Sequence, residues 1–224
     1  MYQPSKLEND NVLEIYKQIC NNFSDTRFNV WPCVKNYIDS QTPHSRGFEI
    51  GCGNGKNMLY AINNGYYMTG IDTCQEFIQM CKERGINEVF NANCVSQTFI
   101  DEQFDFSLSI AVFHHISTSE NRNKSLDNMI NILKIGGSGL VTVWAVEQPP
   151  ESKKKFKEGD NMVSWSKPYY DTNNIRHFEV LERYYYVYSE KMFRDYIDTF
   201  KDRINVIRIF NEYGNWVCEF QKIK

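Results

Sequence analysis

The sequence predicts a single α/β domain, in which helices cover a mostly parallel β-sheet. Between residues 47 and 146, short apolar segments alternate with segments of helical periodicity, as in repeated β-α units. The first apolar segment runs directly into a glycine-rich turn at residues 51–55, where a parallel strand is expected to meet its helix. The length of 224 residues fits one domain of this class with appended elements.

The expected elements begin with a helical lead-in over residues 7–37, where apolar side chains recur loosely on one helical face. Five strands follow, at residues 47–50, 66–71, 89–90, 104–110 and 139–146. Helices are expected from Lys56, over residues 75–84 and over residues 123–133, the last one stopped by Gly136 and Gly137.

The last third of the chain departs from this alternation. Residues 147–182 are polar and contain Pro149, Pro150 and a run of lysines, so we expect an elaborated loop there. Residues 190–200 place apolar side chains on one helical face. Two apolar segments, 204–210 and 216–220, flank a turn and predict a closing antiparallel hairpin.

Composition and charge restrict the classes of function. The formal net charge of −3 argues against a uniformly basic nucleic-acid binder, although a local basic patch is compatible with it. The seven cysteines are scattered and form no C-x-x-C pair, so we expect reduced thiols and no metal site. No apolar run approaches the roughly 20 residues of a membrane-spanning helix, and the N-terminus lacks the apolar segment of a signal peptide. We therefore expect no membrane association and a cytoplasmic protein, with the nucleus as an alternative.

The glycine-rich turn is a candidate ligand site. Gly51, Gly53 and Gly55 follow the first strand, where the absence of a Cβ atom lets the backbone approach a ligand. A plain turn is the alternative, and a dinucleotide fingerprint does not fit because the third glycine comes one residue too early. Asp72 closes the second strand, where a carboxylate accepts both hydroxyls of a ribose; a solvated strand-end aspartate is the alternative for Asp72 alone.

These residues carry a family resemblance. The pattern E-x-G-x-G-x-G from Glu49, the acidic strand end at Asp72 and the segment F-D-F-x-x-S-I-A at residues 104–111 resemble class I methyltransferases. The resemblance implies a Rossmann-like fold with a mostly parallel seven-stranded sheet, an antiparallel C-terminal hairpin and a helical N-terminal lead-in. It also implies S-adenosylmethionine as the cofactor, with contacts from Glu49, Asn93, Ile110 and Ala111. Asn93 stands where such enzymes usually have Asp for the adenine amino group, and an Asn carbonyl still accepts that hydrogen bond.

Four further blocks, in order, narrow the resemblance. Residues 26–32, 51–56, 109–115 and 144–148 are similar to the eukaryotic tRNA wobble-uridine carboxymethyl methyltransferases, in their standalone form. The similarity continues through residues 183–188 and 214–216 and is weakest over 149–177. It implies methyl transfer to the carboxylate of 5-carboxymethyluridine in the tRNA anticodon loop. It also implies a small zinc-binding activator subunit that forms a heterodimer beside an edge of the sheet. The expected organisation is a lead-in (1–44), a cofactor-binding half (45–146), a substrate-side loop (147–182) and a C-terminal helix and hairpin (183–224).

Four residues are candidates for the acceptor site. Arg27 is expected to bind a carboxylate bidentately, either that of the substrate or that of the cofactor, and a surface arginine is the alternative. His115 follows the fourth strand and is expected to hydrogen-bond the acceptor or its uracil, whereas His114 is expected to be structural. Trp144 offers an aromatic plane to an unstacked base or fills the core, and Glu147 is expected at the uracil edge.

The tRNA backbone requires cations, and loops on the expected active face supply them. The candidates are Lys153, Lys154, Lys155, Lys157, Arg122, Lys124 and Arg176, with a solvated charge run as the alternative. Two other functions remain open. A small-molecule carboxyl or O-methyltransferase shares the same cofactor half, because a fold does not fix the acceptor. A catalytically weak cofactor-binding scaffold is the non-enzymatic alternative.

Overall fold

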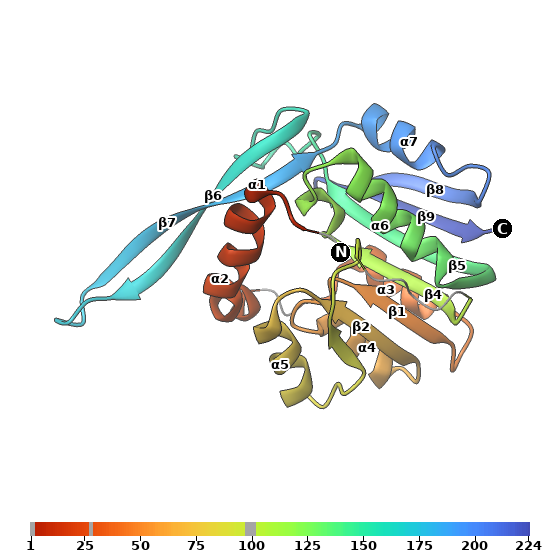
Figure 1. Cartoon of the computed structure of the whole chain (residues 1–224), viewed down its shortest axis with the longest axis horizontal. Coiled ribbons are helices and arrows are strands. Elements are labelled where there is room, and N and C mark those ends of the chain that lie inside the picture. The colour runs from red at the N-terminus through yellow and green to blue at the C-terminus, as the bar shows by residue number, and fades with distance from the viewer. Residues whose placement is uncertain (1–2, 27–28, 97–101) are drawn as a thin grey trace.

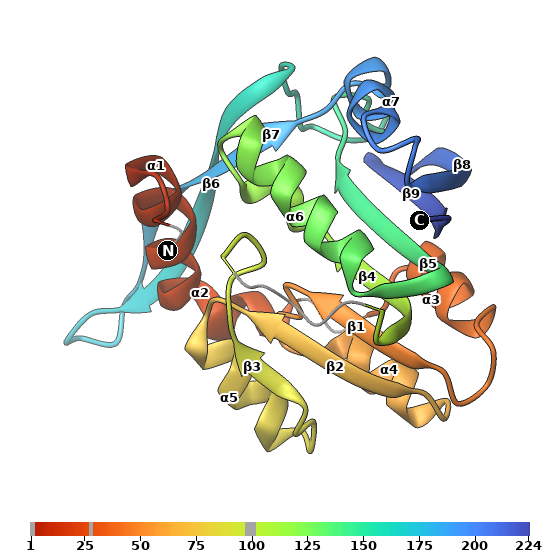
Figure 2. The same cartoon turned by 45° about the vertical axis from the view of Figure 1, so that its right-hand side comes forward.

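The computed structural model describes residues 3–26, 29–96 and 102–224. Its centre is a seven-stranded sheet with helices on both faces (Figures 1 and 2). In spatial order the strands are β3 (Val89–Asn91), β2 (Tyr67–Asp72), β1 (Arg46–Ile50), β4 (Phe104–Ile110), β5 (Leu133–Trp144), β9 (Asn215–Lys222) and β8 (Ile204–Glu212). The first five are parallel, and β9 and β8 are antiparallel, which confirms the predicted sheet.

The helices form two layers. Helices α3 (Pro32–Asp39), α4 (Lys56–Asn63) and α5 (Gln75–Glu83) contribute to one core cluster, and α6 (Ser119–Asn131) and α7 (Glu190–Asp198) contribute to the other. The N-terminal lead-in comprises α1 (Lys6–Glu8), a π-helical turn (Asn9–Leu13) and α2 (Glu14–Asp25). It lies beside the carboxyl ends of the parallel strands, where ligands of open α/β sheets bind (Figure 1).

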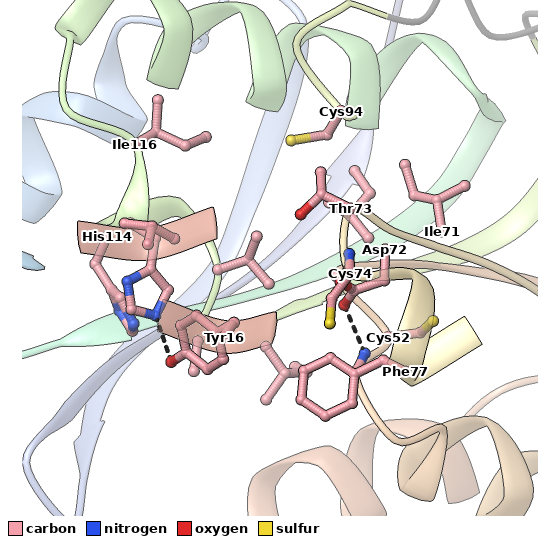
Figure 3. A pocket seen from close by; sticks show the side chains of 18 of the residues that line it. Tyr16, Cys52, Ile71, Asp72, Thr73, Cys74, Phe77, Cys94, His114 and Ile116 are labelled. Atoms are coloured by element: carbon pink, nitrogen blue, oxygen red, sulfur yellow. Dashed lines mark hydrogen bonds between the residues drawn. The ribbon is translucent and has the colours of Figure 1, made fainter. Parts of the chain in front are cut away.

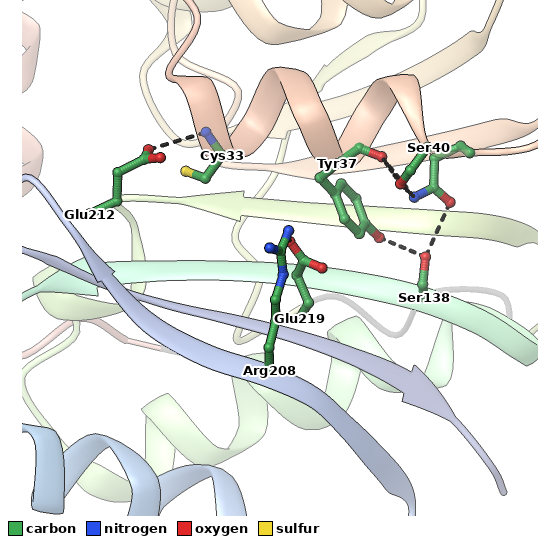
Figure 4. Close-up of polar contacts among 8 residues, drawn as sticks. Cys33, Tyr37, Ser40, Ser138, Arg208, Glu212 and Glu219 are labelled. Atoms are coloured by element: carbon green, nitrogen blue, oxygen red, sulfur yellow. Dashed lines mark hydrogen bonds and ion pairs between the residues drawn. The ribbon is translucent and has the colours of Figure 1, made fainter.

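Helix α3 is fastened to the antiparallel end of the sheet by polar contacts from distant strands (Figure 4). The backbone N–H of Cys33 donates to the Glu212 carboxylate at 3.1 Å, and the hydroxyls of Tyr37 and Ser138 are 2.8 Å apart. These contacts join α3 to strands β8 and β5.

The boundary between α6 and β5 differs from the prediction. Helix α6 ends at Asn131, and Gly136 and Gly137 lie within β5 instead of stopping the helix. The buried ammonium of Lys222 donates to the carbonyl oxygens of Asn131 and Leu133. These carbonyls are satisfied by a side chain from the end of the chain, which no local pattern reveals.

The prediction of a loop over residues 147–182 holds for residues 147–158 and is wrong beyond them. Strands β6 (Gly159–Tyr170) and β7 (Arg176–Val187) pair antiparallel into a two-stranded arm that projects from the body (Figure 1). Asp171 forms the turn at its tip, where its carboxylate accepts from the N–H groups of Asn173 and Ile175. The outer part of the arm is exposed on both faces, so it lacks the alternation of buried and exposed residues that signals a strand. The expected boundary at residue 183 falls inside β7.

None of the helices within the described part of the chain is long and apolar enough to cross a membrane.

Candidate active site

A cavity opens at the carboxyl ends of β1, β2 and β4 (Figure 3). The glycine-rich turn and Asp72 form one side, and the lead-in helices cover it. The base of the arm and Trp144 form the far side. All of the predicted cofactor residues except Gly55 line this space, together with two of the four predicted acceptor residues, His115 and Trp144.

The glycine-rich turn adopts left-handed backbone conformations. Gly51 has φ 66°, and a Cβ atom there would lie 2.4 Å from a methyl carbon of Val112. Gly53 has φ 51°, and a Cβ atom there would meet nothing within 4 Å among the described residues. Gly51 is thus needed for close packing, whereas Gly53 leaves open space beside the backbone for a ligand.

The carboxylate of Asp72 is held by two backbone groups at the edge of this turn. It accepts from the N–H of Gly53 at 2.9 Å and from the N–H of Cys74 at 2.9 Å. Burial raises the pKa of Asp72, and these hydrogen bonds oppose that shift. Each oxygen keeps acceptor capacity for a ligand hydroxyl. Asn93 follows β3, the strand that pairs with β2, and its side-chain oxygen accepts from the N–H of Val95 at 2.8 Å.

Two buried polar side chains under the turn are incompletely paired. Glu49 is 1% exposed, and one of its oxygens accepts from the Asn57 amide at 2.7 Å. The other oxygen of Glu49 and the amide oxygen of Asn57 have no partner among the described residues. Burial raises the pKa of Glu49 to about 8. Both side chains line the cavity, so a ligand that carries N–H donors would satisfy them.

The end of β4 turns toward the cavity at Ile110 and Ala111. Ala111 has φ 60°, a conformation that non-glycine residues seldom adopt. Its N–H donates to the carbonyl oxygen of Thr142 at 3.1 Å and to the Thr142 hydroxyl at 2.9 Å. Contacts with β5 therefore hold this strained residue at the cavity wall, as is common at functional sites.

Both ring nitrogens of His115 are already paired. Nδ1 donates to the Tyr184 carbonyl oxygen at 2.9 Å, and Nε2 accepts from the Tyr16 hydroxyl at 3.0 Å. Burial lowers the pKa of His115 to about 3, so the ring is neutral. A direct hydrogen bond to an acceptor would require Tyr16 to move. His114 is buried and accepts from the N–H of Trp144 at 3.0 Å.

Trp144 lines the cavity within an aromatic stack. Its ring lies 3.9 Å from the Tyr185 ring, at an interplanar angle of 13°, and the Lys154 ammonium lies 4.6 Å over it. Tyr185 covers one face, so an incoming base would have to displace Lys154 from the other.

Besides Gly55, two predicted site residues are not among the described residues that line the cavity. Glu147 accepts from the Trp216 indole N–H at 3.0 Å and from the N–H of Glu190 at 3.1 Å. It thus joins β9 to the start of α7, and it is absent from the described residues that line the cavity. Arg27 lies outside the described residues.

Arg183 is a cavity residue that the sequence analysis did not single out. It is 5% exposed, and its guanidinium lies 4.8 Å from the Trp165 ring and 5.2 Å from the Tyr185 ring. Its Nε has no hydrogen-bond partner, and no carboxylate pairs with it, within the described ranges. A lone arginine at the start of an aromatic run, Tyr184 to Tyr186, was the signal that could have revealed it.

Comparison with known proteins identifies the family. A methyltransferase-domain family model matches residues 48–141. A tRNA (carboxymethyluridine(34)-5-O)-methyltransferase from Schizosaccharomyces pombe is 32% identical over 206 residues, which cover 86% of this chain and 88% of that protein. This chain belongs to the tRNA (carboxymethyluridine(34)-5-O)-methyltransferase family. The relative of that name from Saccharomyces cerevisiae is 35% identical over 172 residues, covering 74% of this chain and 60% of that protein.

Solved structures show the same fold for this family member. An S-adenosylmethionine-dependent methyltransferase from Clostridium acetobutylicum superposes with a TM-score of 0.69 at 12% identity, covering 93% of this chain and 99% of that one. This chain uses S-adenosylmethionine as its cofactor, and the lining of its cavity fits this molecule. Asp72 offers acceptors for a ribose, and Glu49 and Asn57 offer unpaired oxygens for an ammonium group. The open space beside Gly53 accommodates the part of the cofactor that links its ribose to its ammonium group.

Proposed function

We propose that this enzyme methylates the carboxylate of 5-carboxymethyluridine at the anticodon wobble position of tRNA and forms the methyl ester. The observation that carries the proposal is Arg183. A buried guanidinium without an acidic partner in the described chain is costly unless a ligand supplies the anion. The names of the relatives point to an acceptor that carries a carboxylate.

The neutral side chains around Arg183 suit such an acceptor. A carboxylate with an ordinary pKa near 4 is ionised at neutral pH, so the reaction needs no general base. Burial keeps His114 and His115 uncharged, and neither is prepared to act as an acid at pH 7. When bound, S-adenosylmethionine supplies an electrophilic methyl group. Arg183 would orient the carboxylate, and the aromatic wall of Trp144 and Tyr185 would exclude water.

Arg27 remains a proposed second carboxylate ligand, for either the substrate or the cofactor. The decisive experiment for the function is radiolabelled methyl transfer to total tRNA, followed by nucleoside analysis. Appearance of the methyl ester of 5-carboxymethyluridine is expected. Transfer to a small carboxylic acid, with none to tRNA, would favour the small-molecule alternative. Binding of S-adenosylmethionine without methyl transfer to any acceptor would favour the cofactor-binding scaffold.

We also propose a heterodimer with a small zinc-binding activator subunit at the β3 edge of the sheet. The sheet has two edges, β3 and β8. A register shift between Val206 and Arg208 interrupts the β8 ladder, and such irregularities hinder edge pairing. At the other edge, Phe90 on β3 is 51% exposed. Loss of co-purification on Phe90→Asp, but not on Ile207→Asp, would support this edge.

The proposed compartment is the cytoplasm, with the nucleus as the alternative. The seven cysteines are free and buried, as is usual in reducing compartments. Fractionation of cells that express the tagged chain tests this placement.

A further inference from the structure

One face of the β6–β7 arm continues the wall of the cavity. The register places Val163 opposite Arg183, Trp165 opposite Leu181, Lys167 opposite Glu179 and Tyr169 opposite His177. Side chains two residues apart on a strand share a face, so all of these lie on one side of the arm. We call this side the inner face; it is defined by Arg183, Trp165, Leu181, Lys167, Glu179, Tyr169 and His177.

Trp165 joins the inner face to the cavity. The guanidinium of Arg183, which lines the cavity, lies 4.8 Å from the Trp165 ring. The ring of Phe23, which also lines the cavity, lies 6.0 Å from it. The aromatic rings that line the cavity therefore continue onto the inner face of the arm.

Farther out, the inner face keeps alternating cations with aromatic rings. The Lys167 ammonium lies 3.8 Å from the Glu179 carboxylate, and both side chains are partly exposed, so this pair is weak and exchangeable. At the tip, the Tyr169 ring stacks on the His177 ring at 5.3 Å and 25°. About half of the Tyr169 surface is exposed. Accessible flat rings separated by cations are what single-stranded nucleic acid requires, because bases stack on rings and phosphates pair with cations.

We propose that the inner face binds the unpaired nucleotides next to the one whose base enters the cavity. This inference rests on the proposed tRNA substrate and names the surface that holds it. Arg183 and His177 are six steps apart along the strand, which is about 20 Å at the usual rise per residue. That length spans several nucleotides of a loop. The basic run at residues 153–157 passes the cavity on the Trp144 side, so it would meet the backbone on the other side of the same base.

The opposite face of the arm supplies a matched control. Met162, Val180, Phe178 and Tyr170 lie there, and all four are exposed. Tyr170 and Phe178 sit as far out as Tyr169 and His177, so their removal deletes a similar aromatic surface from the same tip. The two pairs differ in the direction in which the rings face and in their neighbours, because the Arg176 guanidinium lies 5.0 Å over the Phe178 ring, whereas His177 contacts the Asp171 carboxylate at 3.0 Å.

The test measures affinity for a fluorescent anticodon stem–loop RNA by anisotropy, at one salt concentration and with the same partner composition in every sample. Tyr169→Ala/His177→Ala should weaken binding about fivefold or more, because the loss of stacking on a single base costs at least about that factor. Tyr170→Ala/Phe178→Ala should bind like the wild type. Affinity for S-adenosylmethionine and the circular dichroism spectrum should be unchanged in both variants.

Equal affinity of the inner-face variant and the wild type would overturn the proposal, and so would equal loss in both variants or no RNA binding by the wild type. The assay needs no methyl transfer, so it is separable from the proposed function. If the wild type methylates tRNA and the inner-face variant binds RNA normally, the proposed RNA-binding role of the arm is wrong and the proposed function stands. If the wild type binds but does not methylate RNA, and binding is lost only in the inner-face variant, the proposed function is wrong and the RNA-binding role of the arm stands.

Discussion

The hydroxyl of Tyr16 donates a hydrogen bond of 3.0 Å to Nε2 of His115. This bond joins helix α2 to the turn that follows β4 and closes one side of the cavity. A second contact lies nearby, where the buried Glu8 carboxylate accepts from the Ser117 hydroxyl at 2.8 Å. The lead-in thus forms part of the cavity wall instead of a detached extension.

Removal of the Tyr16 hydroxyl should destabilise the protein. Tyr16→Phe leaves His115 Nε2 without its donor, and an unpaired buried acceptor costs about 1–3 kcal/mol. Urea unfolding monitored by fluorescence measures the loss. Tyr213→Phe, at a tyrosine that is 77% exposed, is the control and should unfold like the wild type. A Tyr16→Phe midpoint equal to that of the wild type would show that the bond contributes nothing.

Stability should fall as the pH is lowered from 6.5 toward 3. The unfolded chain protonates His115 near pH 6.5, whereas burial lowers the pKa of the folded ring to about 3. The unfolded state therefore binds more protons in this window and gains stability relative to the folded state. The expected loss from His115 between pH 7 and 5 is about 2 kcal/mol, and His114 adds a loss in the same direction. If the unfolding midpoint of the wild type falls with pH while that of His114→Gln/His115→Gln does not change, the two histidines cause the loss of stability. A wild-type midpoint that does not change with pH would contradict the prediction.

Affinity for S-adenosylmethionine should rise with pH up to about pH 8. The raised pKa of Glu49, about 8, keeps its carboxyl protonated at neutral pH, and an incoming ammonium group favours the ionised form. Binding should therefore release a proton, which calorimetry in buffers of different ionisation enthalpy detects. Glu49→Gln should bind more weakly and lose the pH dependence. Proton release that persists in Glu49→Gln would assign the titration to another group.

Asp72→Ala should weaken S-adenosylmethionine binding at least tenfold, about 1.4 kcal/mol, through lost ribose hydrogen bonds. Asp105→Ala is a suitable control, because Asp105 lies near the start of β4, away from the cavity, and pairs with Lys134. Calorimetric titration compares the two variants. Wild-type affinity in folded Asp72→Ala would show that this carboxylate does not hold the ribose.

Arg183→Lys should lose most of the methyltransferase activity. A lysine keeps the charge but loses the planar fork that binds a carboxylate through two N–H groups. We expect kcat/KM for tRNA to fall at least tenfold while S-adenosylmethionine affinity is retained. Arg208→Lys, on the edge strand β8, controls for the substitution itself and should be active. Near wild-type turnover of Arg183→Lys would reduce Arg183 to a packing residue.

Replacement of Lys153, Lys154 and Lys155 by Ala should weaken tRNA binding and flatten its salt dependence. Each lost phosphate contact lowers the slope of log affinity against log salt by roughly 0.7–0.9, equally for cognate and non-cognate tRNA. Titrations at several salt concentrations measure it. An unchanged slope would move the phosphate contacts to Arg122, Lys124, Arg176 or the partner subunit.

The β-α alternation and the cofactor residues were readable from the sequence because their signals are local. A glycine at a left-handed position and an acid at a strand end are fixed by the backbone next to them, so Gly51, Gly53 and Asp72 lie where the pattern predicts. The strand periodicity likewise located β1, β2, β4 and the closing hairpin.

The acceptor side was decided by tertiary contacts between segments far apart in the chain. Glu147 is drawn away to Trp216 and Glu190, and His115 is neutralised by burial under Tyr16. Arg183 reaches the cavity only because β7 pairs with β6 into an arm that composition did not reveal. Local propensity sets which elements form, but burial and long-range pairing set which charged side chains face a ligand, and those depend on the whole fold.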